Sequence, residues 1–190
     1  MSRSVATGLL VTAAAAALVT AYLRPARLGH PVTPFMQSAA EREEGTPVSR
    51  LTLPPDRPAV VVFILPGCPC SEAFEPFVAR LCAAHANRVE FVGVVAGDAR
   101  ASEEWARAHG SPYRVTPDGD REIAREFGAK RSAYTALVVD RKIVRLWPGY
   151  SAGMLRELDA MLADATKSSD HPIAVDGAPD ALTSGCVLDG

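Results

Sequence analysis

Cysteine is the residue type in this sequence that offers covalent chemistry most directly, and two of the four cysteines lie one residue apart. Cys68 and Cys70 belong to the segment PGCPCS (residues 66–71), whereas Cys82 and Cys186 stand alone. Closely spaced thiols can carry out thiol–disulfide exchange or contribute ligands to a metal. Four cysteines in 190 residues are too few for a small disulfide-stabilised protein and too scattered for a four-ligand zinc site.

The segment around Cys68 leaves a predicted buried strand and opens a predicted helix. Residues 59–65 (AVVVFIL) form an unbroken apolar run, which is typical of a strand buried on both faces. Proline is favoured at the first helical position, so Pro69 places Cys68 at the N-cap of the helix that follows. The free N–H groups of Cys70 and Ser71 would then face the Cys68 sulfur and stabilise its thiolate, the nucleophile in disulfide exchange.

The elements that must position this cysteine alternate between strands and helices. Further strands are expected over residues 89–95, 134–139 and 142–147, with a short extended piece at 113–116. Helices are expected over residues 71–85, 102–109, 120–127 and 154–163. Leu51 and Leu53 suggest a short edge strand, and Asp140-Arg141 a hairpin turn. This order predicts an α/β domain with a mixed sheet flanked by helices.

The stretch VVVFILPGCPCSEAFEP resembles the strand–cysteine–helix opening of the thioredoxin-like superfamily. A proline eight residues after the first active-site cysteine is typical of that superfamily, and Pro76 holds this position. Residues 118–151 (DGDREIAREFGAKRSAYTALVVDRKIVRLWPGYS) are similar to the second half of redoxin domains, related to alkyl hydroperoxide reductase and TlpA-like proteins. The resemblance covers residues 48–165, the expected redoxin domain. It implies a thioredoxin-like sheet flanked by helices and a redox-active Cys68.

The sequence departs from this family pattern at three positions. The second cysteine of the usual C-x-x-C pair would fall at Ser71, but the thiol is Cys70; a C-x-C disulfide closes a very small ring, which we expect to be strained and easily reduced. Ala133 stands where the family has a cis-proline facing the active site, so we expect a trans peptide there and altered docking of substrate on that loop. Leu65 stands where peroxiredoxins carry threonine, which weighs against efficient peroxide reduction.

Cys186 lies in the polar, acidic segment 166–190, which has no amphipathic period and is expected to be a flexible tail. A thiol on such a tail can swing to Cys68, since the entropic cost of closing a long loop grows only logarithmically with its length. Cys70 is the preferred resolving thiol for Cys68, and Cys186 is a possible resolving cysteine. Cys82 falls on the apolar face of the predicted helix and is interpreted as a packing residue.

Two other interpretations of the cysteines stay open. One is a peroxiredoxin-like thiol peroxidase, in which Cys68 acts with a resolving thiol; the other is a metal-binding or scaffold module of thioredoxin-like fold. The four histidines have no metal-ligand spacing, and none lies between residues 111 and 148, so we expect no metal and no cofactor. A formal net charge of −2 excludes a global basic field, and no nucleic-acid partner is expected.

The N-terminal residues 1–23 predict one hydrophobic helix that acts as a signal peptide or as a membrane anchor. Residues 5–23 carry no charge and would rise about 28 Å as a helix, close to the thickness of a hydrocarbon core. Residues 24–47, rich in proline, alanine and charged side chains, are expected to be a linker. Export to a periplasmic or other extracytoplasmic compartment would place the cysteines where disulfides persist.

The leading hypothesis is therefore an exported or membrane-tethered thiol–disulfide oxidoreductase. Cys68 would attack the disulfide of a protein or a small molecule and form a mixed disulfide. Cys70, or alternatively Cys186, would resolve that bond. A thiol electron donor would complete the cycle, and residues 5–23 would hold the protein at a membrane if they are not cleaved.

Overall fold

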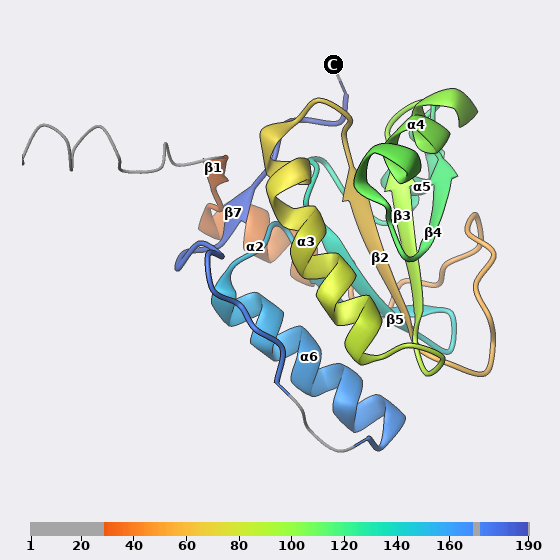
Figure 1. Cartoon of the computed structure of the whole chain (residues 1–190), viewed down its shortest axis with the longest axis vertical. Helices are drawn as coiled ribbons and strands as arrows, with labels where there is room; N and C mark the ends of the chain where they lie inside the picture. The colour runs from red at the N-terminus through yellow and green to blue at the C-terminus, as the bar shows by residue number, and fades with distance from the viewer. Residues whose placement is uncertain (1–28, 169–171, 190) are drawn as a thin grey trace, which may run out of the picture.

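A five-stranded sheet forms the centre of the structure, a computed structural model that describes residues 29–168 and 172–189 (Figure 1). The strands are β2 (Ala59–Ile64), β3 (Glu90–Val95), β4 (Arg114–Pro117), β5 (Thr135–Val139) and β6 (Lys142–Trp147). Their order across the sheet is β4-β3-β2-β5-β6. Strands β2, β3 and β4 are parallel, whereas β5 is antiparallel to both β2 and β6. The predicted mixed α/β sheet is confirmed.

Helices cover both faces of this sheet. They are α2 (Pro34–Glu41), α3 (Pro69–Ala84), α4 (Ala99–His109), α5 (Glu122–Glu126) and α6 (Ala152–Thr166). Figure 1 shows α3 and α6 side by side in front of the sheet and α2 behind it. A separate pair of short strands, β1 (His30–Pro31) and β7 (Thr183–Ser184), joins segments from the two ends of the described chain.

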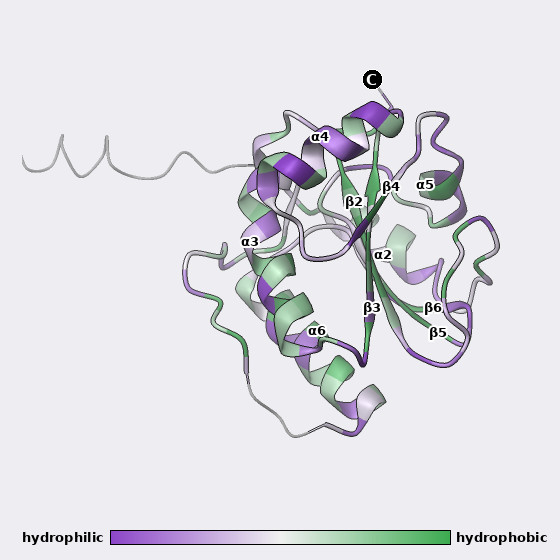
Figure 2. Cartoon of the chain, turned by 45° about the vertical axis from the view of Figure 1, so that its right-hand side comes forward, coloured by the Kyte–Doolittle hydropathy of each residue, from purple (hydrophilic) through white to green (hydrophobic). Residues whose placement is uncertain are grey.

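Two apolar layers enclose the sheet. All residues of β2 are buried, as an unbroken apolar strand at the centre of a sheet requires. The layer on the side of α3 and α6 includes Phe74, Leu81 and Leu155, and the layer on the other face includes Ala40 and Phe127. Figure 2 shows the hydrophobic strands between helices that each present one apolar side. This double burial fixes the end of β2, from which the Cys68 segment leaves.

The predicted hairpin between β5 and β6 is confirmed, and its two turn residues explain its shape. Asp140 and Arg141 both have positive φ angles, of 50° and 58°. Two successive residues in this region form the tight turn whose twist matches that of the flanking strands. The hairpin places β5, and the loop that precedes it, beside β2.

The segment expected to be a linker, residues 24–47, instead contains helix α2 in its described part. Thr33 caps this helix by accepting a hydrogen bond from the Met36 N–H at 3.3 Å, and Pro34 occupies its first turn. Ala40 is buried against the sheet. A cap residue followed by proline is a recognised start of a helix. Leu51 and Leu53 are buried, but they belong to an irregular segment rather than to the expected edge strand.

The segment expected to be a flexible tail, residues 166–190, is held against the domain over much of its described part. We call residues 182–188 the C-terminal strap. Its first part pairs with β1 on one side, and Thr183 exchanges two backbone hydrogen bonds of 2.9 Å with Tyr150 on the other. Farther upstream, the Ile173 N–H donates to the Asp159 carboxylate, which also contacts His85 at 2.7 Å. Hydrogen bonds to fixed partners, rather than an amphipathic period, thus order this segment.

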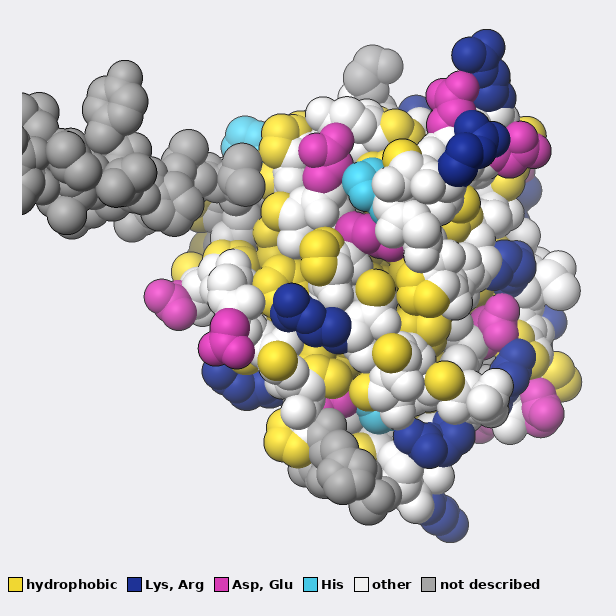
Figure 3. All heavy atoms as spheres, viewed as in Figure 1, with side chains coloured by type: hydrophobic (Ala, Val, Ile, Leu, Met, Phe, Trp, Pro, Cys, Tyr) yellow, Lys and Arg dark blue, Asp and Glu magenta, His cyan; other side chains and the backbone are white. Residues whose placement is uncertain are grey.

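The predicted hydrophobic helix at residues 1–23 lies outside the described residues. Among the helices that the structure describes, none is both long enough and apolar enough to span a bilayer. On the face shown in Figure 3, basic and acidic side chains are interspersed over the surface.

Candidate active site

Cys68 lies where the sequence places it, between β2 and α3. It is the N-cap residue of α3, with φ −85° and ψ 118°, and Pro69 occupies the first turn. The cysteine is almost fully buried, at 2% exposure. Its sulfur, however, lacks the regular capping hydrogen bond to the helix it precedes, and the Ser71 N–H of that helix has only the smallest effect on its pKa. The expected position is therefore confirmed, but the expected donors, the N–H groups of Cys70 and Ser71, are not the main partners.

The Cys68 sulfur is instead surrounded by groups from two other segments. The Ser132 hydroxyl donates to it at 3.3 Å from the loop before β5. The Cys186 backbone N–H donates at 3.3 Å from the C-terminal strap, and the Cys186 sulfur lies 3.0 Å away. Two cysteines separated by 118 residues in the sequence thus lie within hydrogen-bond distance.

These donors make Cys68 acidic despite its burial. Burial by itself raises the pKa of the thiol, but hydrogen bonds from the Cys186 thiol, the Ser132 hydroxyl and the Cys186 and Ser71 backbone N–H groups lower the pKa to about 6. The pKa of Cys186 is raised, because its thiol donates to Cys68 and because it is partly desolvated beside that sulfur. The reduced site therefore holds one thiolate at Cys68 and one neutral thiol at Cys186 at neutral pH.

Cys70 lies in the first turn of α3 but has the opposite character. It is 3% exposed, and burial together with the nearby Cys68 charge raises its pKa to about 11. Its sulfur fills the space beside Gly29, where an added Cβ would lie 2.8 Å from it. A neutral, buried thiol is a weak nucleophile. Both resolving cysteines that the sequence suggests lie close to the Cys68 sulfur: Cys70 hydrogen-bonds to it from within α3, and the Cys186 sulfur approaches it to 3.0 Å from the C-terminal strap.

Ala133 occupies a constrained position at the edge of this site. It is fully buried, its φ is +61°, and the described residues contain no cis peptide bond, so the peptide before it is trans as expected. Its N–H donates to the Phe63 carbonyl at 2.8 Å, which fixes the loop against β2. The group that reaches the sulfur comes from the preceding residue, Ser132. Sequence reasoning singled out Ala133 and missed Ser132, whose side chain is one position from the expected substrate loop.

The C-terminal strap reaches Cys68 by pairing with the loop before β5. The Ser132 N–H donates to the Cys186 carbonyl at 2.8 Å, and the Gly185 N–H donates to the Ser132 carbonyl at 3.0 Å. Arg131 pairs with Val187, and the Arg131 side chain donates through Nε to the Gly185 carbonyl at 2.9 Å. These contacts hold the strap on both sides of Cys186.

Three glycines make this close approach possible. An added Cβ at Gly185 would lie 2.0 Å from the Ser132 hydroxyl oxygen, and one at Gly149 would lie 2.4 Å from the Thr183 carbonyl oxygen. At Gly29 it would lie 2.7 Å from the Ser184 carbonyl oxygen. Because real Cβ atoms do not approach other atoms so closely, the strap fits only where these side chains are missing. The strap is thus shaped to lie over the thiolate.

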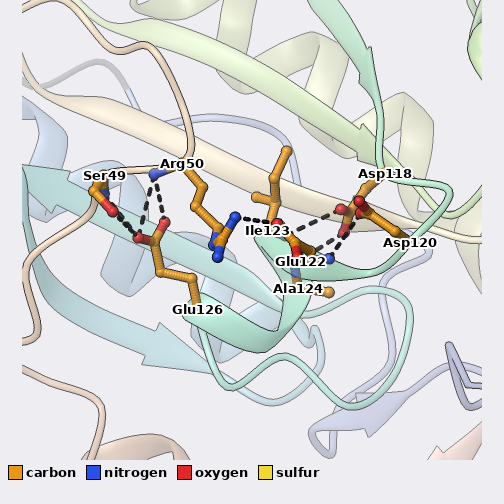
Figure 4. A network of polar contacts seen from close by, with 8 residues as sticks. All are labelled: Ser49, Arg50, Asp118, Asp120, Glu122, Ile123, Ala124 and Glu126. Carbon is orange, nitrogen blue, oxygen red and sulfur yellow. Dashed lines mark hydrogen bonds and ion pairs between the residues drawn. The ribbon is translucent and has the colours of Figure 1, made fainter.

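Cys82 and a cavity near α5 lie outside this arrangement. The Cys82 thiol donates to the Pro112 carbonyl at 3.7 Å, in agreement with a packing role. The cavity, of about 450 Å³, includes Arg50, Asp118 and Glu122 in its lining. Figure 4 shows that carboxylates of its lining are engaged: Asp118 accepts the N–H groups of Ile123 and Ala124, Asp120 accepts that of Glu122, and the Glu122 carboxylate pairs with Arg50. Next to the cavity, Glu126 accepts the N–H groups of Ser49 and Arg50. The residues described form no cluster of three or more side chains able to hold a metal.

The fold and the thiol pair together define a class, the thiol-dependent redox enzymes built on a thioredoxin-like domain. Within that class, the chain belongs to the redoxin family, since residues 32–162 match the family Redoxin. The match begins before residue 48, the start expected from the sequence, and therefore includes α2. No curated protein is similar enough in sequence to match.

Solved structures share this fold at low sequence identity. A hypothetical protein from Sinorhizobium meliloti has a TM-score of 0.57 at 16% identity, over 84% of this chain and 96% of its own. A bacterioferritin comigratory protein from Xanthomonas campestris, described for alkyl peroxide reduction, has a TM-score of 0.51 at 16% identity, over 58% and 81%. The MTB protein dsbF, in mixed oxidised and reduced forms, has a TM-score of 0.50 at 24% identity, over 58% and 81%. These similarities establish a thioredoxin-like fold.

Proposed function

We propose that this protein is an exported thiol–disulfide oxidoreductase in which Cys68 attacks the substrate and Cys186 resolves the mixed disulfide. The observation that carries the proposal is the pairing of an ionised Cys68 with a second thiol whose sulfur lies 3.0 Å away. Thiolates are the attacking species in disulfide exchange, and a nearby second thiol releases the bound substrate.

The first step transfers the substrate to Cys68. The Cys68 thiolate attacks one sulfur of the substrate disulfide, a Cys68–substrate bond forms, the substrate S–S bond breaks, and the other substrate sulfur leaves as a thiolate. In the second step, Cys186 loses its proton and attacks the Cys68 sulfur. The Cys68–Cys186 disulfide forms and the remaining substrate thiolate leaves, so two electrons pass from the protein to the substrate. A dithiol donor then reduces the protein disulfide.

Substrate access requires the strap to move. Cys68 is only 2% exposed while Cys186 lies over it, so a substrate disulfide can reach the sulfur only after residues near Cys186 shift. Apolar contacts anchor the two ends of the strap, at Leu182 and Leu188, whereas backbone hydrogen bonds hold its middle, and Val187, next to Cys186, is 46% exposed. The middle of the strap can therefore shift while its ends stay packed. Its return after the first step brings Cys186 to the mixed disulfide.

A second candidate function is a thiol peroxidase, and the Ser132 hydroxyl favours it. A hydroxyl donor 3.3 Å from the thiolate could also bind a peroxide oxygen. The Cys68 thiolate would attack a peroxide to give a sulfenic acid and an alcohol or water, and Cys186 would then form the disulfide with loss of water. Leu65, at the position where peroxiredoxins carry threonine, makes this the weaker candidate.

Export is proposed on the sequence alone. The uncharged segment 5–23 is suited to a signal peptide or a membrane anchor, and an oxidising compartment would supply disulfide substrates. A fusion of residues 1–47 to a reporter that is active only outside the cytoplasm would test this assignment. Reporter activity is expected, and its absence would remove the compartment from the proposal.

Single cysteine variants test the catalytic roles. Reduction of a model disulfide is expected to cease in Cys68→Ser, to stop at a trapped mixed disulfide in Cys186→Ser, and to persist in Cys70→Ser. Mass spectrometry of the acid-quenched reaction identifies the trapped species. Unchanged turnover in Cys68→Ser would overturn the proposal. Rapid consumption of peroxide combined with slow disulfide reduction would favour the peroxidase instead.

A further inference from the structure

We infer that Arg131 is a positioning residue for the second step: it holds Cys186 over Cys68 and supplies the positive charge that lets Cys186 become the thiolate once Cys68 is bonded to substrate. This inference rests on the proposed function, since it assigns Cys186 as the resolving thiol.

Arg131 contacts both neighbours of Cys186 in the sequence, Gly185 and Val187. Its Nε donates to the Gly185 carbonyl at 2.9 Å, and its backbone pairs with Val187. The neighbouring Ser132 N–H donates to the Cys186 carbonyl at 2.8 Å. The residue before Cys186 and the residue after it are therefore both held by Arg131, which leaves the Cys186 side chain directed along the short path to Cys68.

The charge of Arg131 is available to the sulfurs. Within residues 29–168 and 172–189, no carboxylate lies within ion-pair distance of its guanidinium, in contrast to Arg50, Arg57 and Arg145. The side chain is half-buried, so water screens its charge less than at an exposed position. An unpaired guanidinium beside a thiol favours the thiolate.

The groups around Cys186 change between the two steps. In the reduced site, donation of the Cys186 proton to Cys68 raises the pKa of Cys186, as do burial and the Cys68 charge, and Arg131 acts against these effects. The mixed disulfide removes the Cys68 charge and with it the acceptor for the Cys186 proton. Cys70 remains neutral, because burial, the largest cause of its raised pKa, does not depend on the charge of Cys68. Of the groups that act on Cys186 in the reduced site, only burial and Arg131 then remain.

The consequence is an ordered transfer of negative charge from one sulfur to the other. Cys68 carries it before substrate binds, when Cys186 serves as its hydrogen-bond donor. Cys186 carries it afterwards, when it must attack. Arg131 thereby acts on resolution. The first attack depends on the Cys186 thiol, the Ser132 hydroxyl and the backbone donors around Cys68. The backbone hydrogen bonds of Ser132 with Gly185 and Cys186 keep these donors in place when only the Arg131 side chain is changed.

The test measures each step separately in Arg131→Gln, Arg131→Lys and the control Arg125→Gln, an exposed position on α5 outside the strap. Stopped-flow kinetics with a chromogenic disulfide report attack by Cys68, and quenched samples report the decay of the mixed disulfide across pH 5–10. In Arg131→Gln we expect near-normal attack, at least tenfold slower resolution at neutral pH, and a pH midpoint for resolution moved upward. Arg131→Lys is expected to restore the midpoint, and the control to match the wild type.

An unchanged pH midpoint in Arg131→Gln would overturn the inference even if resolution slowed, because a purely structural role would move the rate alone. Cys186→Ser is measured in parallel to separate this outcome from failure of the proposed function. If Cys186→Ser still releases substrate, Cys186 is not the resolving thiol, and the catalytic assignment falls whatever the Arg131 variants show.

Discussion

A cysteine at a helix N-cap ionises readily when donors reach its sulfur, and in this protein the main donors, the Cys186 thiol first among them, come from outside the helix. Ser132 and the Cys186 N–H both donate at 3.3 Å, and they offset the burial that would otherwise keep Cys68 neutral. The helix thus sets where the sulfur lies, while the loop before β5 and the strap set its charge. Replacing either partner should change reactivity without moving the cysteine.

The pH dependence of Cys68 is the first prediction at this scale. In the folded protein, the pKa of the Cys68 thiol is lowered to about 6. The thiolate fraction of Cys68, and with it the rate of its alkylation, should therefore rise through pH 6 and level off near pH 7.5. Because the unfolded thiol titrates near pH 8.5, the free energy of unfolding of the reduced protein should also rise between pH 6 and about 8.5. Alkylation kinetics followed by mass spectrometry, with urea titrations at each pH, check both. A Cys68 midpoint above pH 8 would contradict the assignment.

Ser132→Ala should weaken the thiolate. Loss of one hydrogen bond to a charged sulfur corresponds to a rise of about one unit in the pKa of Cys68 and about tenfold slower alkylation near pH 6. Ser184→Ala is the matched control, since the Ser184 hydroxyl is buried but has no hydrogen-bond partner within the described part of the chain. Equal alkylation midpoints for the two variants would remove Ser132 from the site.

At the scale of elements, the strap depends on close backbone approach. Gly185→Ala would place a Cβ against the Ser132 hydroxyl and 2.9 Å from the Ser132 carbonyl oxygen. The hydroxyl can rotate away, but the carbonyl cannot move while the two residues stay paired. Loss of the two backbone hydrogen bonds that Ser132 forms with the strap, one with Gly185 and one with Cys186, each worth about 1 kcal/mol, should raise the population of the open strap by about tenfold or more.

In Gly185→Ala, Cys68 should therefore be alkylated faster by bulky reagents while the mixed disulfide resolves more slowly. The rate of amide hydrogen exchange at residues 183–188 measures how often the strap opens. Gly153→Ala serves as the control, because its Cβ would meet only the Ser151 hydroxyl, at 3.7 Å. If Gly185→Ala exchanges at the wild-type rate, the strap does not need a glycine there.

The elements that could be predicted are those whose signals are local. The apolar run of β2, the Pro69 start of α3 and the β5–β6 hairpin each show in a short window of sequence, and all three are confirmed. The C-terminal strap has no comparable local sequence signal. It is ordered by backbone hydrogen bonds with Ser132, about 53 positions earlier in the chain, and with Tyr150. Helix α2 did carry a local signal, Thr33-Pro34, which the proline-rich composition around it obscured.

The same distinction explains the site. Cys68 could be placed from its own neighbours in the sequence, whereas the proposal that Cys186 rather than Cys70 resolves the mixed disulfide depends on a contact between distant segments. Sequence proximity favoured Cys70, but a residue two positions into a helix shares the burial of that helix and stays neutral. Contacts that join distant parts of the chain are set by tertiary packing and leave little trace in local patterns.

For the whole molecule, formation of a Cys68–Cys186 disulfide should strongly stabilise the folded state. A bond between Cys68 and Cys186 would close a loop between positions 118 residues apart, which in a chain-entropy account stabilises the fold by about 4–5 kcal/mol. The melting temperature of the oxidised protein should then exceed that of the reduced protein by about 10–20 °C. Calorimetry with and without reductant measures the difference, and Cys186→Ser should melt at one temperature in both. Equal melting of oxidised and reduced wild type would show that the two sulfurs do not join.

The long span of that disulfide also determines whether the polypeptide can pass through a narrow pore from one end. Strands β3 to β6 and helices α4 to α6 all lie between the two cysteines, so the oxidised polypeptide is a closed ring with two free ends. A translocation pore or an unfolding protease that draws a chain in from one terminus would meet a doubled strand at the ring. The reduced form would pass as a single strand, so any passage through such a pore has to come before the two sulfurs are oxidised.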